Sequence, residues 1–382
     1  MNFQDWAINQ FELNTLNWVL YGLALILLIT SIYIIYSTLI KVSKYPVLTP
    51  IANGLPPISV IIAARNEYDN LKDLISSLLQ QSYPQFEIIL MNDGSVDATD
   101  EWATVFAQQE PRFKYTFLNP EVMKAEGKKI ALTLGIKKAS YDNFVFIDGD
   151  CKVHSNDFLK YYGTLFSQGK NLILGISQYH KYKGFLNQYI QYQTTKTALN
   201  YLSAAISGKP YMGVGRNMGY TRSLYKQVNG FESHYDIPCG DDDLFVQDVM
   251  KLAHVSVLLE QDSQTTSNPK TAWNTYIKQR LRHMWAGKFY KPFIKFNLSI
   301  RPIIEISLFI ILLMAAIINS KWVISVLFIM IWITYVLYQF NKAKKRISAS
   351  NSTLGLLILS PFNYFFQVFM GIKLYFTKNI KW

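Results

Sequence analysis

Four long apolar runs set the first limit on how this chain can fold. They comprise residues 16–40, 302–318, 322–340 and 354–376, so one precedes and three follow a central stretch of mixed composition. Run 16–40 contains no charged residue and is long enough to cross a bilayer as a helix. It has neither the basic start nor the small-residue cleavage site of a signal peptide, so we expect a retained anchor.

The three later runs predict a helical hairpin and one segment whose placement is open. The polar residues 319–321 separate the second and third runs and predict a tight turn there. Run 354–376 could span, re-enter or lie along the membrane surface, because a proline and three polar residues interrupt it. These residues are Pro361, Asn363, Gln367 and Lys373.

Basic residues beside the apolar runs predict the orientation in the membrane. Lys41 and Lys44 follow the first run, and a basic cluster at 342–346 follows the third. Both clusters should be cytoplasmic, so we expect the N-terminus outside and the central domain in the cytoplasm. Lys378 and Lys381 favour a cytoplasmic C-terminus, whereas a spanning fourth run would place it outside.

The net charge of +12 is compatible with attraction to anionic lipid headgroups and with a phosphorylated substrate. The sequence contains no basic-aromatic recognition module, so we expect no nucleic-acid partner. Cys151 and Cys239 fall in the part expected in the cytoplasm, where a disulfide is not expected. Neither cysteine has zinc-like spacing to histidines.

Between the apolar runs, short apolar strands alternate with amphipathic helices. We expect strands at 59–64, 87–91, 113–118 and 143–147, and helices at 70–81, 97–108 and 128–139. This alternation predicts an α/β fold with parallel strands joined by right-handed crossovers. The strands are continuously apolar, which fits a sheet that is buried on both faces.

The second half of the chain is less regular. We expect a strand at 172–179 and helices at 186–206, 241–254 and 271–296, the last of them basic, aromatic and amphipathic. We therefore divide the chain into an N-terminal segment with a span, a cytoplasmic domain, an interface helix, a membrane hairpin, and a basic loop with a membrane-associated or spanning segment. Their bounds are 1–45, 46–270, 271–300, 301–341 and 342–382.

Asp148 and Asp150 end the most apolar expected strand, separated by Gly149. Two carboxylates at this point reach the carboxyl edge of the sheet, where open α/β sheets bind ligands. Hard oxygen donors suit Mg²⁺ or Mn²⁺, and such ions commonly hold the phosphates of a nucleotide. The alternative is a glycine turn with two solvated acids.

Other polar residues follow the neighbouring expected strands. Asp93 could accept a hydrogen bond from the imide N–H of a uracil, or cap the helix that follows. Arg65 and Glu67 end the first strand, in either a ligand loop or a solvated loop. Lys128 and Lys129 are either solvated helix residues or point back toward phosphates.

A second acidic cluster lies at Asp241, Asp242 and Asp243. Three adjacent acids repel one another, so at least one pKa is expected to rise, which suits a general base. The alternative is a solvated helix start that the helix dipole favours. The glycine-rich segment 213–218 precedes the cluster and is either a close approach to a ligand or a bulged strand.

The expected basic helix carries Gln279, Arg280, Arg282 and His283. Arginine there could hold a leaving diphosphate through charge-assisted hydrogen bonds, or contact lipid headgroups instead. His283 by itself is more typical of a packed or exposed residue than of a catalytic one.

The order of these segments resembles the family 2 glycosyltransferases, which are inverting enzymes with the GT-A fold. The resemblance covers residues 59–285. Ser-Val-Ile-Ile-Ala-Ala-Arg-Asn-Glu at 59–67 looks like the first strand and loop of the family. Asn-Asp-Gly-Ser-Val-Asp at 92–97 is similar to its Asp-Asp-Gly-Ser-x-Asp, with Asn92 in place of the first acid.

The resemblance also assigns roles. Lys128 matches a family lysine that approaches the nucleotide, and Asp148-x-Asp150 matches the metal-binding motif. Asp241 and Asp242 occupy the acidic pair whose second residue is the base. By the same likeness Arg65, Glu67 and Asp93 would hold the base and ribose, while Asp148 positions the metal or the ribose.

Gln279-x-x-Arg282 matches a motif of membrane polysaccharide synthases, such as those for cellulose and hyaluronan. His283 stands where the family has tryptophan, and Trp285 lies two residues further on. This difference, and the few helices available to build a polymer channel, weaken the case for a processive synthase.

The resemblance implies a multi-pass glycosyltransferase of the bacterial inner (plasma) membrane, with its catalytic domain in the cytoplasm. It would move a sugar, hexosyl or N-acetylhexosaminyl in type, from a nucleotide-diphosphate sugar such as a UDP-sugar to a lipid-linked or glycan acceptor. Mg²⁺ or Mn²⁺ would assist the inverting displacement. The oligomeric state is open.

Three alternatives stay open at this point. One is a processive polysaccharide synthase, and another is an inactive sugar-nucleotide sensor or export-complex scaffold. A nucleotidyltransferase on a similar sheet is the third, but the sequence contains no glycine-rich triphosphate loop.

Overall fold

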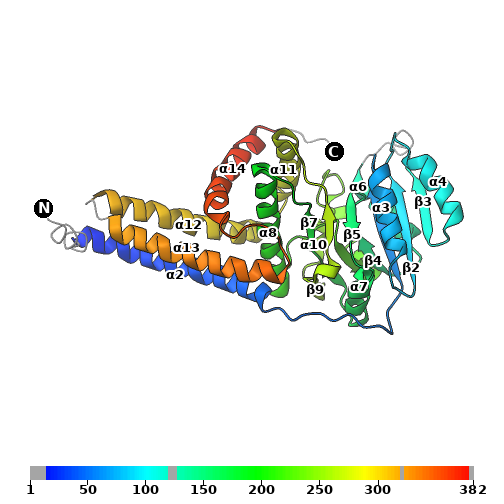
Figure 1. Cartoon of the computed structure of the whole chain (residues 1–382), viewed down its shortest axis with the longest axis horizontal. Coiled ribbons are helices and arrows are strands. Elements are labelled where there is room, and N and C mark those ends of the chain that lie inside the picture. The colour runs from blue at the N-terminus through cyan, green and yellow to red at the C-terminus, as the bar shows by residue number, and fades with distance from the viewer. Residues whose placement is uncertain (1–13, 119–126, 319–321, 378–382) are drawn as a thin grey trace.

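The computed structural model describes residues 14–118, 127–318 and 322–377. Figure 1 shows an α/β domain at one end of the molecule and a bundle of long helices at the other. Helix α8 (Phe185–Ile206) stands between the two parts. The expected turn at 319–321, and Lys378 and Lys381, lie outside the described residues.

Within the described residues, seven strands form the main sheet in the order β3-β2-β1-β4-β8-β6-β9. In chain order they are β1 (Ile58–Ala64), β2 (Phe86–Asn92), β3 (Phe113–Phe117), β4 (Asn143–Phe146), β6 (Leu172–Leu174), β8 (Met218–Thr221) and β9 (Val255–Val257). All neighbours pair in parallel except β8, which is antiparallel to β4 and β6. The prediction of an α/β domain with a mostly parallel sheet is confirmed.

Both faces of this sheet are covered, which explains why its strands are continuously apolar. On β1, Val60 and Ile62 pack in the cluster that contains helix α3, whereas Ile61 packs in the cluster that contains α6. Burial of each such side chain contributes about 1.5–3 kcal/mol to the free energy of folding. The helices of the domain are α3 (Tyr68–Leu79), α4 (Thr99–Gln109), α6 (Lys128–Lys138), α7 (Phe158–Ser167), α9 (Arg222–Gln227), η1 (Glu232–His234), α10 (Asp243–Val249) and η2 (Gln261–Ser263).

The strand expected at 172–179 is two strands in two sheets. β6 ends at Leu174, and β7 (Ser177–Tyr179) joins a small sheet with β10 (Thr265–Ser267) and β5 (Cys151–Val153). Asn217 causes the break, because its backbone oxygen accepts from Gly175 N at 2.9 Å and its side-chain amide donates to Ile176 O at 2.6 Å. The chain therefore crosses between the sheets over Asn217.

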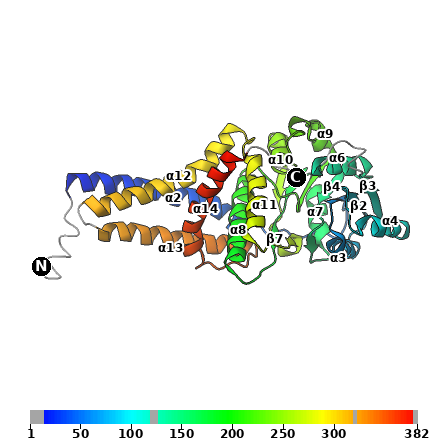
Figure 2. The same ribbon diagram turned by 90° about the horizontal axis from the view of Figure 1, so that it is seen from above.

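Of the described helices, four are long and apolar enough to cross a membrane. They are α2 (Thr15–Ser43), α12 (Pro292–Ile318), α13 (Trp322–Arg346) and α14 (Leu356–Phe376). The first three run along one another, whereas α14 lies across them in both views (Figures 1 and 2). The chain thus has the helices of a multi-pass membrane protein, while its orientation and the placement of α14 in a bilayer stay predictions.

The helix expected at 271–296 is broken near its middle. Helix α11 (Trp273–Gly287) ends at Gly287, and α12 begins at Pro292. Between them, the Tyr290 hydroxyl donates to Asp243, and Lys291 N donates to Gln247 Oε1 at 3.1 Å. These bonds to α10 hold the connecting segment away from a continuous helix.

The helix expected at 241–254 is also shorter than predicted. It begins at Asp243, because Asp242 is its N-cap and accepts from Asp243 N at 2.8 Å. It ends at Val249, after which the chain turns into β9. Asp241 and Asp242 therefore lie in the loop that enters α10 rather than on the helix.

Arg346, at the end of α13, ties the membrane helices to the α/β domain. Its guanidinium donates to Glu260 Oε1 at 2.8 Å and to Pro46 O at 2.9 Å. The same carboxylate oxygen accepts from Leu48 N at 2.9 Å. The segment that follows α2 and the end of α13 are thus joined at one buried carboxylate.

Candidate active site

A cavity of about 1780 Å³ opens at the edge where the parallel strands end. All ten residues expected from the sequence to form the site line this cavity, so the structure brings them together. They are Arg65, Glu67, Asp93, Lys128, Asp148, Asp150, Asp241, Asp242, Gln279 and Arg282. Their chemical roles stay predictions.

Lys128 is the centre of the polar part of this cavity. Its ammonium lies 2.7 Å from Asp148 Oδ1 and 3.2 Å from Asp241 Oδ2. Burial works against the charge, but the carboxylates of Asp148 and Asp241 outweigh it and raise the pKa of Lys128. A Cβ at position 215 would lie 3.1 Å from the Lys128 ammonium, so Gly215 leaves room for it.

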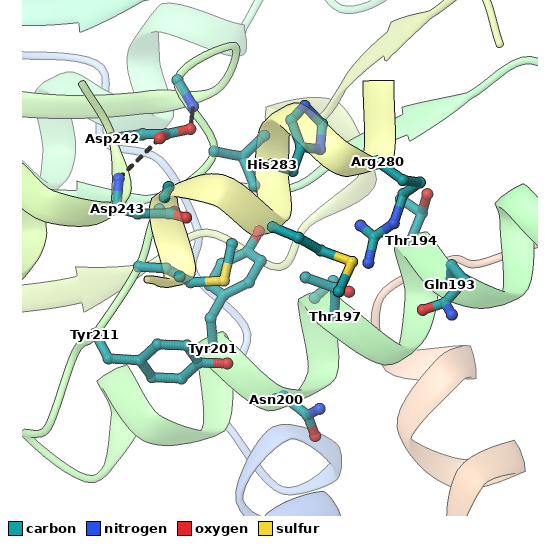
Figure 3. Close-up of a pocket in the computed structure, with 18 of the residues that line it drawn as sticks. Gln193, Thr194, Thr197, Asn200, Tyr201, Tyr211, Asp242, Asp243, Arg280 and His283 are labelled. Carbon is teal, nitrogen blue, oxygen red and sulfur yellow. Dashed lines mark hydrogen bonds between the residues drawn. The ribbon is translucent and has the colours of Figure 1, made fainter. Parts of the chain in front are cut away.

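Asp242 is held at the entrance to α10 by two backbone donors. Gly215 N donates to Oδ2 at 3.0 Å and Asp243 N donates to Oδ1 at 2.8 Å, as Figure 3 shows. Burial, and then the charge of Asp241, raise the pKa of Asp242 to about 6, against the opposing effect of Lys128. A carboxylate with a pKa near neutrality can accept a proton from a hydroxyl group.

Asp148 and Asp150 offer a limited set of metal ligands. Ser267 Oγ donates to Asp150 Oδ2 at 2.8 Å, and Asp148 is paired with Lys128. In the described ranges, no group of three or more His, Cys, Asp or Glu side chains gathers as a metal site. Two carboxylates fit Mg²⁺ or Mn²⁺, which proteins often hold by one or two carboxylates together with substrate phosphates.

The loop after β1 and the turn after β2 support each other. Ser95 Oγ accepts from Asn66 N at 2.8 Å, and Asn66 Oδ1 accepts from Val96 N at 2.8 Å. Asn92 is buried, and its amide donates to Tyr115 Oη at 2.8 Å. At the position of the family's first acid, this chain therefore has a structural amide, while the buried Asp93 lines the cavity.

Helix α11 forms the opposite wall. In Figure 3, Arg280 of α11 points toward Thr194 of α8, whereas His283 lies on the same helix farther from α8. Burial, and then the charges of Arg280 and Arg282, lower the pKa of His283 well below its ordinary value, so its imidazole is neutral at pH 7. A neutral imidazole in the wall is a polar contact for a substrate and not an added cation.

Trp285 lies outside the wall of this cavity. It is absent from the described residues that line the cavity, where His283 is present. The ammonium of Lys288 lies 3.8 Å from the centre of the Trp285 ring. The indole therefore packs under a lysine rather than at the reacting groups.

Arg216 and Arg280 are half-buried arginines of the glycine-rich segment and the basic helix, and sequence reasoning missed a role only for Arg216. Arg216 stacks on the Tyr179 ring at 4.2 Å, and both Arg216 and Arg280 line the cavity. Across the described part of the chain, the Nε atoms of Arg216 and Arg280 have no hydrogen-bond partner. The position of Arg216 within the glycine-rich segment 213–218 was the signal that could have identified it.

The comparisons with known proteins agree with this fold. The family model of glycosyl transferase family 2 matches residues 59–228, and that of glycosyl transferase family group 2 matches residues 144–341. The second match covers more than half of the chain, and the chain therefore belongs to this glycosyl transferase family.

Two curated relatives match only part of the chain. The poly-beta-1,6-N-acetyl-D-glucosamine synthase of Staphylococcus epidermidis is 31% identical over 163 residues, which are 39% of this chain and 38% of the relative. The glycosyltransferase AglE of Haloferax volcanii is 29% identical over 126 residues, which are 32% of this chain and 39% of AglE. The chain thus spans less than half the length of these relatives.

A solved structure covers nearly the whole fold. It is that of the mannosyltransferase PcManGT from Pyrobaculum calidifontis in complex with GDP-Man and Mn²⁺. The TM-score is 0.57, with 16% identity, over 94% of this chain and 100% of that chain. At this identity the likeness shows the fold alone, and it confirms the expected GT-A-like domain.

Lys129 supports the loop that leads to the acidic cluster, contrary to the expectation of a solvated helix lysine. It is buried, and its ammonium donates to the backbone oxygens of His234 and Ile237, the latter at 2.8 Å. Burial lowers the pKa of Lys129 to about 8. The loop of residues 231–241 is thereby fastened to α6.

Replacing Lys129 with Met should loosen this loop. A hydrogen bond to a charged group contributes about 1.5–3 kcal/mol, so local opening should become roughly tenfold or more frequent. We expect faster amide hydrogen exchange over residues 231–241, measured by mass spectrometry. Lys137→Met, on the exposed face of the same helix, is the matched control. Unchanged exchange in Lys129→Met would show that the loop does not depend on this lysine.

Proposed function

We propose that this protein is a membrane glycosyltransferase that moves a sugar from a nucleotide-diphosphate sugar to an acceptor hydroxyl with inversion. The observation that carries the proposal is the position of Lys128 between Asp148 and Asp241. This contact places the carboxylates at the end of β4 beside the loop that holds Asp242. A donor phosphate site and a base thus share one cavity.

The donor lies at the carboxyl edge of the sheet in this proposal. Asp93 and the loop of Arg65 and Glu67 bind the nucleoside, as expected from their places after β2 and β1. Asp150, assisted by Asp148, would hold Mg²⁺ or Mn²⁺, and the ion would supply Lewis-acid stabilisation of the leaving diphosphate when bound. Other cationic side chains of the cavity add charge-assisted hydrogen bonds to the diphosphate. They are Arg216, Arg280 and Arg282.

The chemical step needs a single displacement. The acceptor hydroxyl transfers its proton to Asp242 as its oxygen forms the new bond to the anomeric carbon. The bond from that carbon to the diphosphate breaks on the opposite face, so the configuration inverts. No covalent sugar–protein intermediate is formed, and the nucleoside diphosphate leaves with the electron pair.

The donor proposed is a UDP-sugar, with UDP-N-acetylglucosamine as the first to test. The support is the similarity to a poly-beta-1,6-N-acetyl-D-glucosamine synthase, 31% identical over 163 residues. The acceptor proposed is lipid-linked or a glycan at the membrane, because the cavity is also lined by α2 and α12. The placement proposed is the bacterial inner membrane with the α/β domain in the cytoplasm, from the basic residues after α2 and within the end of α13.

A processive polysaccharide synthase is the second candidate, favoured by the names of the curated relatives. The length of the product made by purified protein separates the two, since a single added sugar excludes processive synthesis. Release of nucleoside diphosphate from the donor excludes the third candidate, an inactive sensor or scaffold.

Asp242→Asn should lose turnover while it still binds the donor. General-base assistance typically contributes about 10²–10⁴-fold, so the acceptor-dependent rate should fall by that factor. The rate is measured as released UDP, and donor binding by calorimetry. Asp236→Asn, which changes an exposed acid of the preceding loop, serves as the control. Near-normal turnover in Asp242→Asn would remove this residue from the role of base.

The pH profile should report the same carboxylate. The base must be unprotonated, and its pKa is raised to about 6, so kcat/KM should fall as the pH drops through about 6. Asp241→Asn removes a charge that raises this pKa, and we expect the acidic limb to move to lower pH. The measurement is UDP release between pH 4.5 and 8 (roughly the span that brackets such a limb). A limb that stays in place in Asp241→Asn would assign it to another group.

Removing both carboxylates after β4 should abolish metal binding. In Asp148→Ala/Asp150→Ala, the affinity for Mn²⁺ in the presence of UDP should fall by more than about 100-fold. Mutation of residues that only support metal ligands typically lowers metal affinity by about 10–100-fold, and removal of the ligands themselves should cost more. Electron paramagnetic resonance of Mn²⁺ measures this without turnover. Asp69→Ala, at an exposed position of α3, is the control. Undiminished binding in the double variant would contradict the proposed metal site.

A further inference from the structure

The cavity does not end at the acidic cluster but continues to the membrane helices. Its walls include Ser37 and Thr38 of α2, Arg301 and Glu305 of α12, and Tyr364 of α14. Helix α8 runs between these helices and the sheet (Figure 1) and lines the cavity along much of its length. One continuous space therefore connects Asp242 with the helices expected in the bilayer.

A group of charged side chains lies at the membrane end of this space. Arg301 Nε donates to Glu305 Oε1 at 2.8 Å, and the Tyr364 hydroxyl donates to the other oxygen of Glu305. Lys196 of α8 points its ammonium over the Tyr364 ring, 5.6 Å from the centre. The group thus links α8, α12 and α14 around the cavity.

The group of Arg301, Lys196 and Glu305 has a net charge of +1 when Lys196 is protonated. Glu305 is 3% exposed and neutralises Arg301, its partner one turn away. Among the residues that the structure describes, no carboxylate lies within ion-pair distance of the Lys196 ammonium, which lies over the rings of Tyr192 and Tyr364. Burial, and then the charge of Arg301, lower the pKa of Lys196 to about 8. A bound anion would restore the balance of charge and favour the ammonium form.

The surroundings of the group favour an anion that carries a lipid tail. The outer faces of the two membrane helices beside it are apolar: Ile303 and Ile310 of α12 are 60% and 52% exposed, and Phe365 and Val368 of α14 are 77% and 62% exposed. The contact between Tyr364 and Glu305 bridges these helices beside the cavity. A headgroup inside the cavity could therefore continue into a tail on these faces.

We propose that Lys196 and Arg301 bind the phosphate of a lipid-linked acceptor, whose tail lies against α12 and α14. This inference rests on the proposed function and names its acceptor class. Along α8, Tyr201 lies about 7.5 Å beyond Lys196 at 1.5 Å per residue, and it faces the part of the cavity that holds Asp242 (Figure 3). A sugar attached to the phosphate thus presents its hydroxyl to the base.

Phytanyl phosphate is a suitable probe, with the neutral alcohol phytanol as its matched control. Native mass spectrometry of the full-length protein, released from phosphatidylcholine nanodiscs, measures bound lipid. We expect binding of phytanyl phosphate and not of phytanol. Lys196→Met should weaken binding about tenfold or more, because it removes a charge-assisted hydrogen bond. Lys196→Arg should retain it, and Lys226→Met, on the exposed surface of α9, should match the unmodified protein.

Three outcomes would overturn the inference. Phytanol bound as tightly as phytanyl phosphate would show that no phosphate is recognised. Undiminished binding in Lys196→Met would place the phosphate elsewhere. Inorganic phosphate that displaces the lipid at equal concentration would assign the site to a free anion.

The proposed function is tested separately in the same preparation. Mn²⁺-dependent hydrolysis of UDP-N-acetylglucosamine by the unmodified protein reports donor chemistry without the acceptor. Hydrolysis without selective binding of phytanyl phosphate refutes only the acceptor site. Binding that depends on Lys196, without turnover of any nucleotide sugar, refutes only the enzymatic function.

Discussion

The ammonium of Lys128 joins two segments that would otherwise repel each other. Asp148 follows β4 and Asp241 precedes α10, and both carboxylates lie within 3.2 Å of this one cation. Inside a protein such charges interact more strongly than in water, so this cation offsets much of the repulsion between the two acids. The same charge opposes the rise in the pKa of Asp242. One lysine therefore contributes both to the geometry of the acidic cluster and to the pKa of Asp242, the proposed base.

The site residues at the strand ends could be predicted because each is adjacent in sequence to the strand that positions it. Strands β1, β2 and β4 are apolar runs that stop at polar residues, and parallel strands end at one edge of a sheet. Asp93, Asp148 and Asp150 were placed in this way. The break at Gly175 could not be foreseen, because its cause is Asn217, which lies far away in the chain. Likewise, the helix expected at 271–296 breaks because of bonds to α10.

Buried cations were the least predictable part of the site. Lysine is usually solvated, so Lys129 had no sequence signal for its role beneath the loop of residues 231–241. Lys196 and Arg301 line the same end of the cavity, and the charge of Arg301 lowers the pKa of Lys196. They come together because α8 lies beside the membrane helices, which no spacing in the sequence reveals. His283 was noticed as a replacement for tryptophan, yet only the fold shows it in the cavity wall beside two arginines.

The segment between α11 and α12 connects a membrane helix to α10, the helix that follows Asp242. Lys291 N and Nζ both donate to Gln247, and Tyr290 donates to Asp243, so the start of a membrane helix is fastened to the helix capped by Asp242. Helices tilt when the hydrocarbon thickness differs from their apolar length. A tilt of α12 would therefore pull on α10, and the composition of the surrounding lipid would tune the position of Asp242, the proposed proton acceptor.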